Sequence, residues 1–136
     1  MEATFPGALE FWRHTIDHLR ALEPVVTVFG DQPTDEESRD GGYVIVDPDP
    51  GYSLYERACG GQSEQSYRVD LRCCGHSPAQ MINTVDKVRA RMRGFAPWPD
   101  DRWSLVREIS ANPSVLDDTV PTDPRWSTTL TYHVEG

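Results

Sequence analysis

The sequence has few of the features that mark secreted or membrane proteins. Its three cysteines are an odd number, and two of them, Cys73 and Cys74, are adjacent. Neighbouring residues of a strand point to opposite faces, so these two are poorly placed to bridge each other, and the pattern fits a reducing cytoplasm. The first residues lack the basic start and apolar core of a signal peptide. No apolar run approaches the ~20 residues that span a bilayer, so we expect no membrane association.

Basic residues are also scarce. Lys and Arg number 13 against 22 Asp and Glu, which gives a net charge of -9 and a pI near 4.7. Affinity for DNA comes mainly from cations that displace counterions, so this balance argues against a nucleic-acid-binding protein. The 136 residues predict a single domain, 1–136, with a modest apolar content of 38%. We therefore expect part of its stability to come from association with other chains.

Sequence motifs of catalysis and cofactor binding are missing. The chain has no Gly-rich phosphate loop, no nucleophile elbow and no His-Glu-x-x-His. His14 and His18 have the spacing of two zinc ligands on one helical face, but Thr15 stands where a metalloprotease has its Glu. Surface histidines are the favoured interpretation. We expect no enzyme, no cofactor and no metal site.

Two other groups of potential metal ligands have simpler interpretations. Asp47 and Asp49 would need a third converging ligand or a nearby His for metal or acid–base chemistry, and nothing at this spacing supplies one. The run Cys73-Cys74-Gly75-His76, taken with Cys59, matches no common structural zinc pattern. Thiols buried in a core are the favoured interpretation.

The most strongly patterned stretch runs from Gln65 to Gly94. Its first half alternates, with one face carrying Tyr67, Val69, Leu71 and Cys73, and the other carrying Arg68, Asp70 and Arg72. This predicts a long half-buried strand that ends at Gly75-His76.

A helix follows that strand. Ser77-Pro78-Ala79-Gln80 has the form of a helix start, in which Ser77 accepts from the Gln80 N–H and Gln80 returns the bond. Apolar residues then recur at helical spacing up to Gly94, the predicted stop; they are Met81, Val85, Val88 and Met92.

The rest of the chain predicts further strands and one more helix. A first helix is expected from Pro6 to about Leu22, with an apolar stripe of Leu9, Trp12, Ile16 and Leu19. Strands are expected at Val25–Phe29, Tyr43–Val46, Trp103–Glu108 and Arg125–Val134, with a ragged one within Tyr52–Ala58. Turn or loop is expected at Asp47–Gly51 and Ser110–Pro124. The order indicates an α+β fold, a mainly antiparallel sheet of four to six strands with two helices packed on one face.

An acidic segment separates the first two predicted strands. Residues 30–42 hold five acidic residues, one Arg and no apolar side chain, so the segment cannot pack into a core. It is either a solvated connection or an arm that becomes ordered only against a partner.

Several blocks of the sequence together resemble a known family. They are Tyr43–Gly51, Tyr67–Gly75 running into Ser77–Gln80 and Val85–Arg89, and Asp117–Pro121 before the strand that ends at Thr131-Tyr132. In this order, after a leading helix, they resemble the tail terminator (tail-completion) proteins of long-tailed bacteriophages and prophages, particularly from actinobacterial hosts. The likeness covers nearly the whole chain. One departure is the acidic segment after Gly30, which is longer and more charged than the family pattern.

The resemblance implies a non-enzymatic virion protein, assembled in the host cytoplasm and located at the head-proximal end of the tail. Such proteins form a homohexameric ring that caps the tail tube, stops its polymerisation and docks to the head-completion or neck proteins. Genomic DNA would pass through the channel without specific binding. The alternatives are another neck component, such as a stopper or connector, and a small α+β ligand-binding or enzymatic domain.

The hypothesis names seven interface residues. Asp35, Glu36 and Glu37 are assigned to the channel or to the tube contact, where few cations would hold DNA. Arg68 and Arg72, on the polar face of the central strand, are assigned to a contact with an acidic neighbouring subunit. The other two candidates are Asp117 and Asp118, in the last block of the resemblance.

Overall fold

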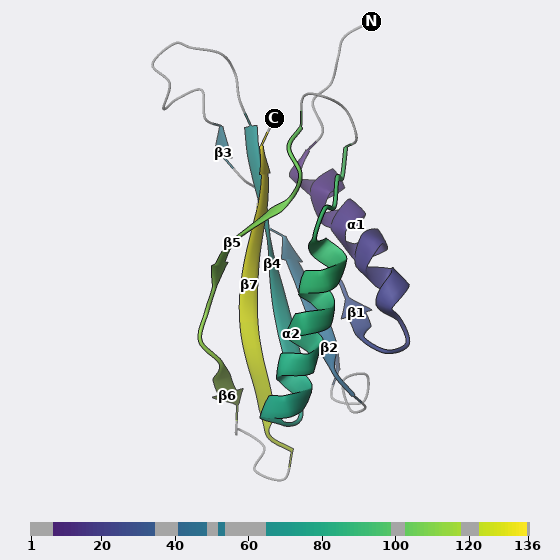
Figure 1. Cartoon of the computed structure of the whole chain (residues 1–136), viewed down its shortest axis with the longest axis vertical. Coiled ribbons are helices and arrows are strands. Elements are labelled where there is room, and N and C mark those ends of the chain that lie inside the picture. Colours follow the sequence, from purple (N-terminus) through teal and green to yellow (C-terminus); the bar gives the residue numbers. More distant parts are fainter. Residues whose placement is uncertain are drawn as a thin grey trace, which may run out of the picture.

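The computed structural model describes residues 7–34, 41–48, 52–53, 65–98, 103–117 and 123–135. These residues form one sheet with two α-helices against it (Figure 1). The elements, in chain order, are α1 Ala8–Leu19, the 3-10 helix η1 Arg20–Leu22, β1 Thr27–Phe29, β2 Tyr43–Pro48, β3 Tyr52–Ser53, β4 Gln65–Gly75, α2 Pro78–Met92, β5 Arg107–Ala111, β6 Val115–Asp117 and β7 Arg125–Glu135.

The sheet is mainly antiparallel, as predicted. Its strands follow the order β1-β2-β4-β7-β5, and the short strands β3 and β6 pair with β4 and β7, which makes seven strands among the described residues. Only β1 and β2 run parallel. β4 and β7 form the centre of the sheet and pair from Ser66–Glu135 to Gly75–Trp126. The α+β class is confirmed.

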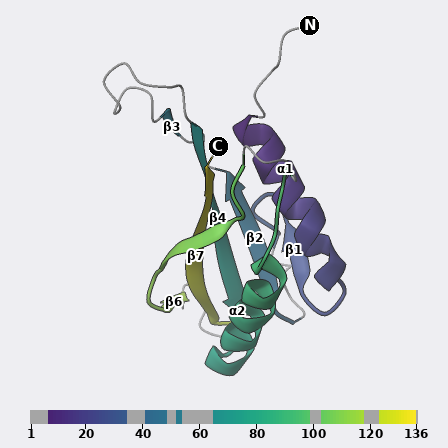
Figure 2. The same ribbon diagram turned by 45° about the horizontal axis from the view of Figure 1, so that its top comes forward.

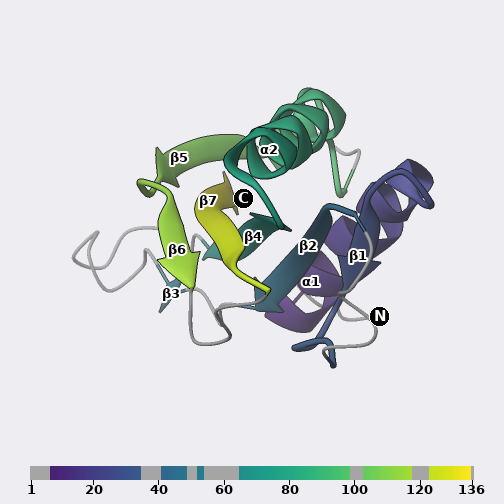
Figure 3. The same ribbon diagram turned by 90° about the horizontal axis from the view of Figure 1, so that it is seen from below.

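Both helices cover the same face of the sheet, which confirms the second half of that prediction. Val69, Leu71 and Cys73 of β4 are completely buried there, in one cluster with residues of both helices. Figure 3 shows α2 beside β7 and β4, and α1 beside β2 and β1. The alternation in the sequence therefore predicted the correct face for the side chains from Tyr67 to Cys73 of β4.

The first helical segment runs through α1 and η1 to Leu22, as predicted, but its apolar stripe differs from the prediction. Ile16 and Leu19 are buried as expected, and Trp12 donates from its indole Nε1 to the Val46 carbonyl at 2.7 Å. Leu9, however, is 55% exposed, and Phe11 is completely buried in its place. Phe11 packs against the ring of Trp98, an aromatic partner that lies far along the chain.

The start of α2 has the predicted cap with one changed partner. Ser77 Oγ accepts from the Gln80 N–H at 3.1 Å, whereas Gln80 Oε1 accepts from the N–H of His76 at 2.7 Å rather than from that of Ser77. A Cβ on Gly75 would lie 2.6 Å from the Met81 backbone nitrogen, so this turn requires glycine. Gly94, with φ of +75°, follows the helix in the left-handed region, as predicted for its stop.

Several strand boundaries differ from the predictions. The first strand begins at Thr27 rather than at Val25. Asp47 and Pro48, expected to start a turn that ends at Gly51, instead belong to β2 and lie in register with β4; residues 49–51 lie outside the described residues. The strand expected at Trp103–Glu108 begins only at Arg107. The loop expected at Ser110–Pro124 instead contains the end of β5 and all of β6, whose residues are all exposed and lack the alternation that marks a half-buried strand.

The connection from α2 to β5 packs along the helices. Residues 93–98, which follow α2, run beside α1, and residues 103–106 lead into β5 (Figure 2). The Phe95 ring stacks on the His18 imidazole with centroids 3.9 Å apart. Trp98 and Trp103 contact each other and Tyr67 of β4. The large aromatics of this connection thus cover one end of the core.

Candidate functional site

The sheet face away from the helices carries most of the sequence-predicted site residues that the structure describes. Alternation along β4 places Arg68, Asp70 and Arg72 on this face, and the β4–β7 register places His133, Thr131 and Thr129 opposite them. We call this the open face. The side chains of β4 and β7 on this face are mostly polar and bonded to one another, and a small buried apolar cluster of Tyr43, Ile45 and Cys74 lies beside them.

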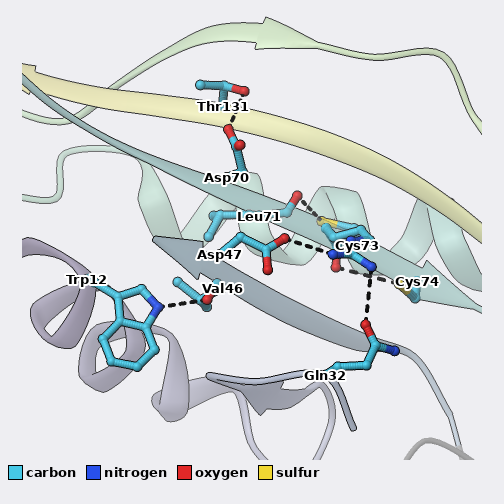
Figure 4. Close-up of polar contacts among 10 residues, drawn as sticks. Trp12, Gln32, Val46, Asp47, Asp70, Leu71, Cys73, Cys74 and Thr131 are labelled. Carbon is cyan, nitrogen blue, oxygen red and sulfur yellow. Dashed lines mark hydrogen bonds and ion pairs between the residues drawn. The ribbon is translucent and has the colours of Figure 1, made fainter. Parts of the chain in front are cut away.

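Arg72 is held by groups of its own chain. Its Nη2 lies 3.0 Å from Asp47 Oδ2, and its Nη1 donates to Gln32 Oε1 at 3.3 Å (Figure 4). Both members of the ion pair keep 38% of their side-chain surface exposed. The assignment of Arg72 to a neighbouring subunit stays a prediction, and the structure shows that Asp47 already orients it.

Two rows of polar pairs lie next to Arg72 on the open face. Asp70 Oδ1 accepts from the Thr131 hydroxyl at 2.7 Å, across β4 and β7 (Figure 4). One row further, Arg68 stands opposite the buried His133. His133 Nε2 in turn lies 3.4 Å from Arg107 Nη2 and 3.3 Å from Glu135 Oε1. Arg68 thus lies in a row with His133 and Arg107.

A second polar cluster lies where β2 and β7 begin and β4 ends. Arg125 Nη2 lies 2.7 Å from Asp123 Oδ2, and Arg125 Nη1 donates to the Tyr43 hydroxyl at 3.2 Å. His76 Nδ1 lies 3.1 Å from Asp123 Oδ1. The hydrogen bond with Asp123 raises the pKa of Arg125, and the hydrogen bond with Arg125 lowers the pKa of Asp123, so both groups are charged at neutral pH.

The sequence analysis missed this second cluster. Its members lie up to 82 positions apart, so no local pattern brings them together. Asp117, a predicted interface residue, stands opposite Arg125 in the β6–β7 register. The other four predicted interface residues, Asp35, Glu36, Glu37 and Asp118, lie outside the described residues.

The adjacent thiols are separated by the sheet, as predicted. Cys73 belongs to the helix-side core, whereas Cys74 packs with Tyr43 and Ile45 on the opposite face. Burial raises the pKa of Cys73, and it raises the pKa of Cys74 to about 11. Both thiols are therefore protonated at neutral pH, which makes them weak nucleophiles and weak metal ligands. Cys59, the third residue of that hypothesis, lies outside the described residues.

The two histidines of α1 have structural partners. The His14 ring meets the Trp98 ring edge-on at 5.8 Å. His18 stacks on Phe95 and bonds through Nε2 to the Arg91 carbonyl at 2.7 Å. Within the ranges that the structure describes, no group of three or more His, Cys, Asp or Glu side chains has the arrangement of a metal site.

Among the described residues, neither α-helix combines the length and the apolar character that crossing a bilayer requires.

Known proteins share this fold at low sequence identity. The chain is similar to one chain of a solved structure described as "Virion of native gene transfer agent (GTA) particle". The TM-score is 0.57 at 14% identity, over 98% of this chain and 100% of that chain. No protein-family model and no curated protein matches the sequence. At this identity, the match shows that the two chains share a fold.

Proposed function

We propose that this chain is a structural protein of a phage-like virion and, within it, the tail terminator. In this role it forms a ring on the head-proximal end of the tail tube, ends tube polymerisation and presents a docking surface for the head. The observation that carries the proposal is the fold shared over 98% of this chain and the whole of a chain from a gene transfer agent virion. The sequence blocks that resemble tail terminators support it independently.

The arrangement of side chains is compatible with a protein that acts through its surfaces. The described thiols are buried, with pKa values raised above the neutral range. The charged groups of the open face are bonded within the chain, as the Arg72–Asp47 and Arg125–Asp123 pairs illustrate. Such a face is a pre-oriented polar surface, which favours recognition of a partner over chemistry on a small molecule.

The charge of the chain suits a passage for DNA. With a net charge of -9, a ring of several copies would carry a strongly negative field around its channel. Few cations would be available to hold phosphates by counterion release, so DNA would pass without sticking. We assign Asp35, Glu36 and Glu37 to this channel or to the tube contact.

A second candidate is a neck protein of the same virion. The matched structure is described as a whole virion, so the shared fold supports a stopper or connector as well as a terminator. Electron micrographs of particles made without this protein separate the two roles. Abnormally long tails are expected for a terminator. Tails of normal length detached from filled heads would assign the chain to the neck instead.

A further inference from the structure

His133 of β7 lies on the open face but is only 8% exposed, and it is the only buried histidine among the described residues. The register places Arg68 of β4 on one side of it and Arg107 of β5 on the other. The third charged group that faces it is Glu135, two residues further along β7. Asp70 of β4 lies one row away and is bonded within that row. Two guanidinium groups and one carboxylate therefore lie around a single imidazole ring.

The Nε2 atom of His133 has two neighbours that it cannot bond at the same time. Arg107 Nη2 lies 3.4 Å from it and can only donate a hydrogen bond. Glu135 Oε1 lies 3.3 Å from it and, as part of a carboxylate, can only accept one. Nε2 carries either a lone pair or a hydrogen. With the lone pair it accepts from Arg107, and with the hydrogen it donates to Glu135.

The other ring nitrogen of His133 offers no alternative. Nδ1 is buried and has no hydrogen-bond partner among the described residues. It lacks a partner in both neutral tautomers and in the protonated ring, so these states differ in their hydrogen bonds only at Nε2. The protons on this ring therefore decide whether Arg107 or Glu135 is bonded.

The strand that contains Arg107 lies at the edge of the sheet. β5 ends the strand order, and every one of its residues is exposed. Its register with β7 shifts between Glu108 and Ser110, so the backbone ladder is interrupted within five residues. An exposed edge strand with an interrupted ladder belongs to the part of a fold that opens most readily. The side chains that hold β5 to the rest of the sheet therefore affect how often it opens.

Two side chains hold β5, one on each face of the sheet. On the helix side, Glu108 Oε1 accepts from Arg89 Nε and from the Tyr132 hydroxyl, at 2.9 Å each. On the open face, Arg107 is bonded to His133. Of these two anchors, only the one on the open face includes a histidine, the side chain that changes its charge between about pH 5 and 8.

From this geometry we infer that His133 is a pH-sensitive latch on β5. In the neutral ring, Nε2 accepts from Arg107 and holds the strand to β7, while Glu135, whose side chain is 49% exposed, can bond water instead. When the ring gains a proton, Nε2 donates to Glu135 and the cationic ring repels Arg107. The anchor on the open face is then lost and β5 opens more often. The inference does not depend on the proposed virion role.

The protons on the His133 ring test the inference without any variant. Long-range proton–nitrogen correlation spectra of the isotope-labelled full-length chain distinguish the two neutral tautomers and the charged form of each histidine. At about pH 7.5, His133 is expected to carry its hydrogen on Nδ1 and none on Nε2, and at about pH 5 it is expected to carry both. A hydrogen on Nε2 at the higher pH, or a ring that stays neutral at the lower pH, would overturn the inference.

Hydrogen exchange of backbone amides tests the consequence for β5. The reporters are the amides of β5 and those of Ser104 and Asn112, which donate to β7 carbonyls on either side of it. After correction for intrinsic exchange rates, their protection is expected to fall at least about fivefold relative to the amides of β4 between about pH 7.5 and about pH 5, the factor that the loss of one hydrogen bond gives. The β4 reference removes any change in global stability.

Three variants assign the effect to this ring. His133→Gln keeps an acceptor for Arg107 but cannot take up a proton, so the protection of β5 is expected not to change with pH. Arg107→Gln removes the guanidinium and is expected to show, at about pH 7.5, the low protection that the wild type has at about pH 5. His14→Gln, on α1, is the matched control and is expected to behave as the wild type. A wild-type protection that does not fall in acid, or an equal fall in His133→Gln, would contradict the latch.

Discussion

At the scale of single residues, the side chains of β4 that face the helices stabilise the fold through burial. Leu71 has no exposed surface and lies between Val46 of β2 and Leu130 of β7 in the sheet register. Leu105, also a leucine, is 54% exposed. Truncating each leucine to alanine therefore compares the same substitution at a buried and at an exposed position.

Leu71→Ala is expected to lower the free energy of unfolding by about 2–5 kcal/mol, because it removes buried methyl groups and leaves a cavity. Leu105→Ala is the matched control and is expected to change it by less than about 0.5 kcal/mol. Urea denaturation followed by tryptophan fluorescence measures both. Equal effects at the two positions would contradict the assignment of Leu71 to the core.

His18 makes stability depend on pH. Partial burial lowers its pKa below the ordinary 6.5, with a smaller opposing contribution from its bond to the Arg91 carbonyl. The unfolded chain therefore binds a proton at a higher pH than the folded chain does. The stabilisation from neutral His18 is complete above about pH 6.5 and is lost as the pH falls towards the lowered folded pKa.

We expect the urea midpoint of the wild-type chain to fall between pH 7 and pH 5, and His18→Gln to remove part of that fall. The comparison of the two slopes isolates this histidine from the other titrating groups. Parallel pH profiles for wild type and variant would show that His18 does not contribute.

At the scale of elements, the strand-turn-helix from β4 to α2 follows from local sequence alone. Alternation fixes the faces of β4, Ser77 begins the helix, and Gly75 and Gly94 take positions that need glycine. The end of β4 at Gly75 and the cap of α2 at Ser77 therefore lie within three consecutive residues.

Replacing Ser77 with Ala removes the side-chain acceptor for the Gln80 N–H and is expected to cost about 1 kcal/mol. Ser114→Ala, in the exposed segment between β5 and β6, is the control and is expected to be neutral. Chemical denaturation measures both. A neutral Ser77→Ala would show that the hydrogen bond does not stabilise α2.

Other elements could not be predicted locally. β5 and β6 have no buried face, so their residues show no alternation between apolar and polar side chains. Their pairing with β7 depends on backbone hydrogen bonds, which the sequence pattern does not reveal. In α1 the prediction was right for Ile16 and Leu19 and wrong for Leu9, which is exposed, while Phe11 is buried against Trp98, 87 positions away. The Arg125–Asp123–His76 cluster likewise depends on how distant strands end beside one another.

At the scale of the whole molecule, the described residues form a well-packed centre between the sheet and its two helices. β5 ends the strand order, and every residue of β5 and β6 is exposed, so this edge of the sheet is uncovered among the described strands. The sequence predicted the α+β class and the polar residues of the open face. It did not predict that β5 and β6 form an exposed edge of the sheet, because an exposed strand carries no alternation of buried and exposed residues.

The central claim is that this protein caps a growing tail tube, and the polymerisation of purified tube protein tests it most directly. Tube protein from the same genome is assembled with and without this chain, and tube lengths and ends are measured by electron microscopy. We predict that added protein occupies one end of each tube and halts growth at that end. Tubes that keep their length distribution and carry no bound protein at either end would contradict the account.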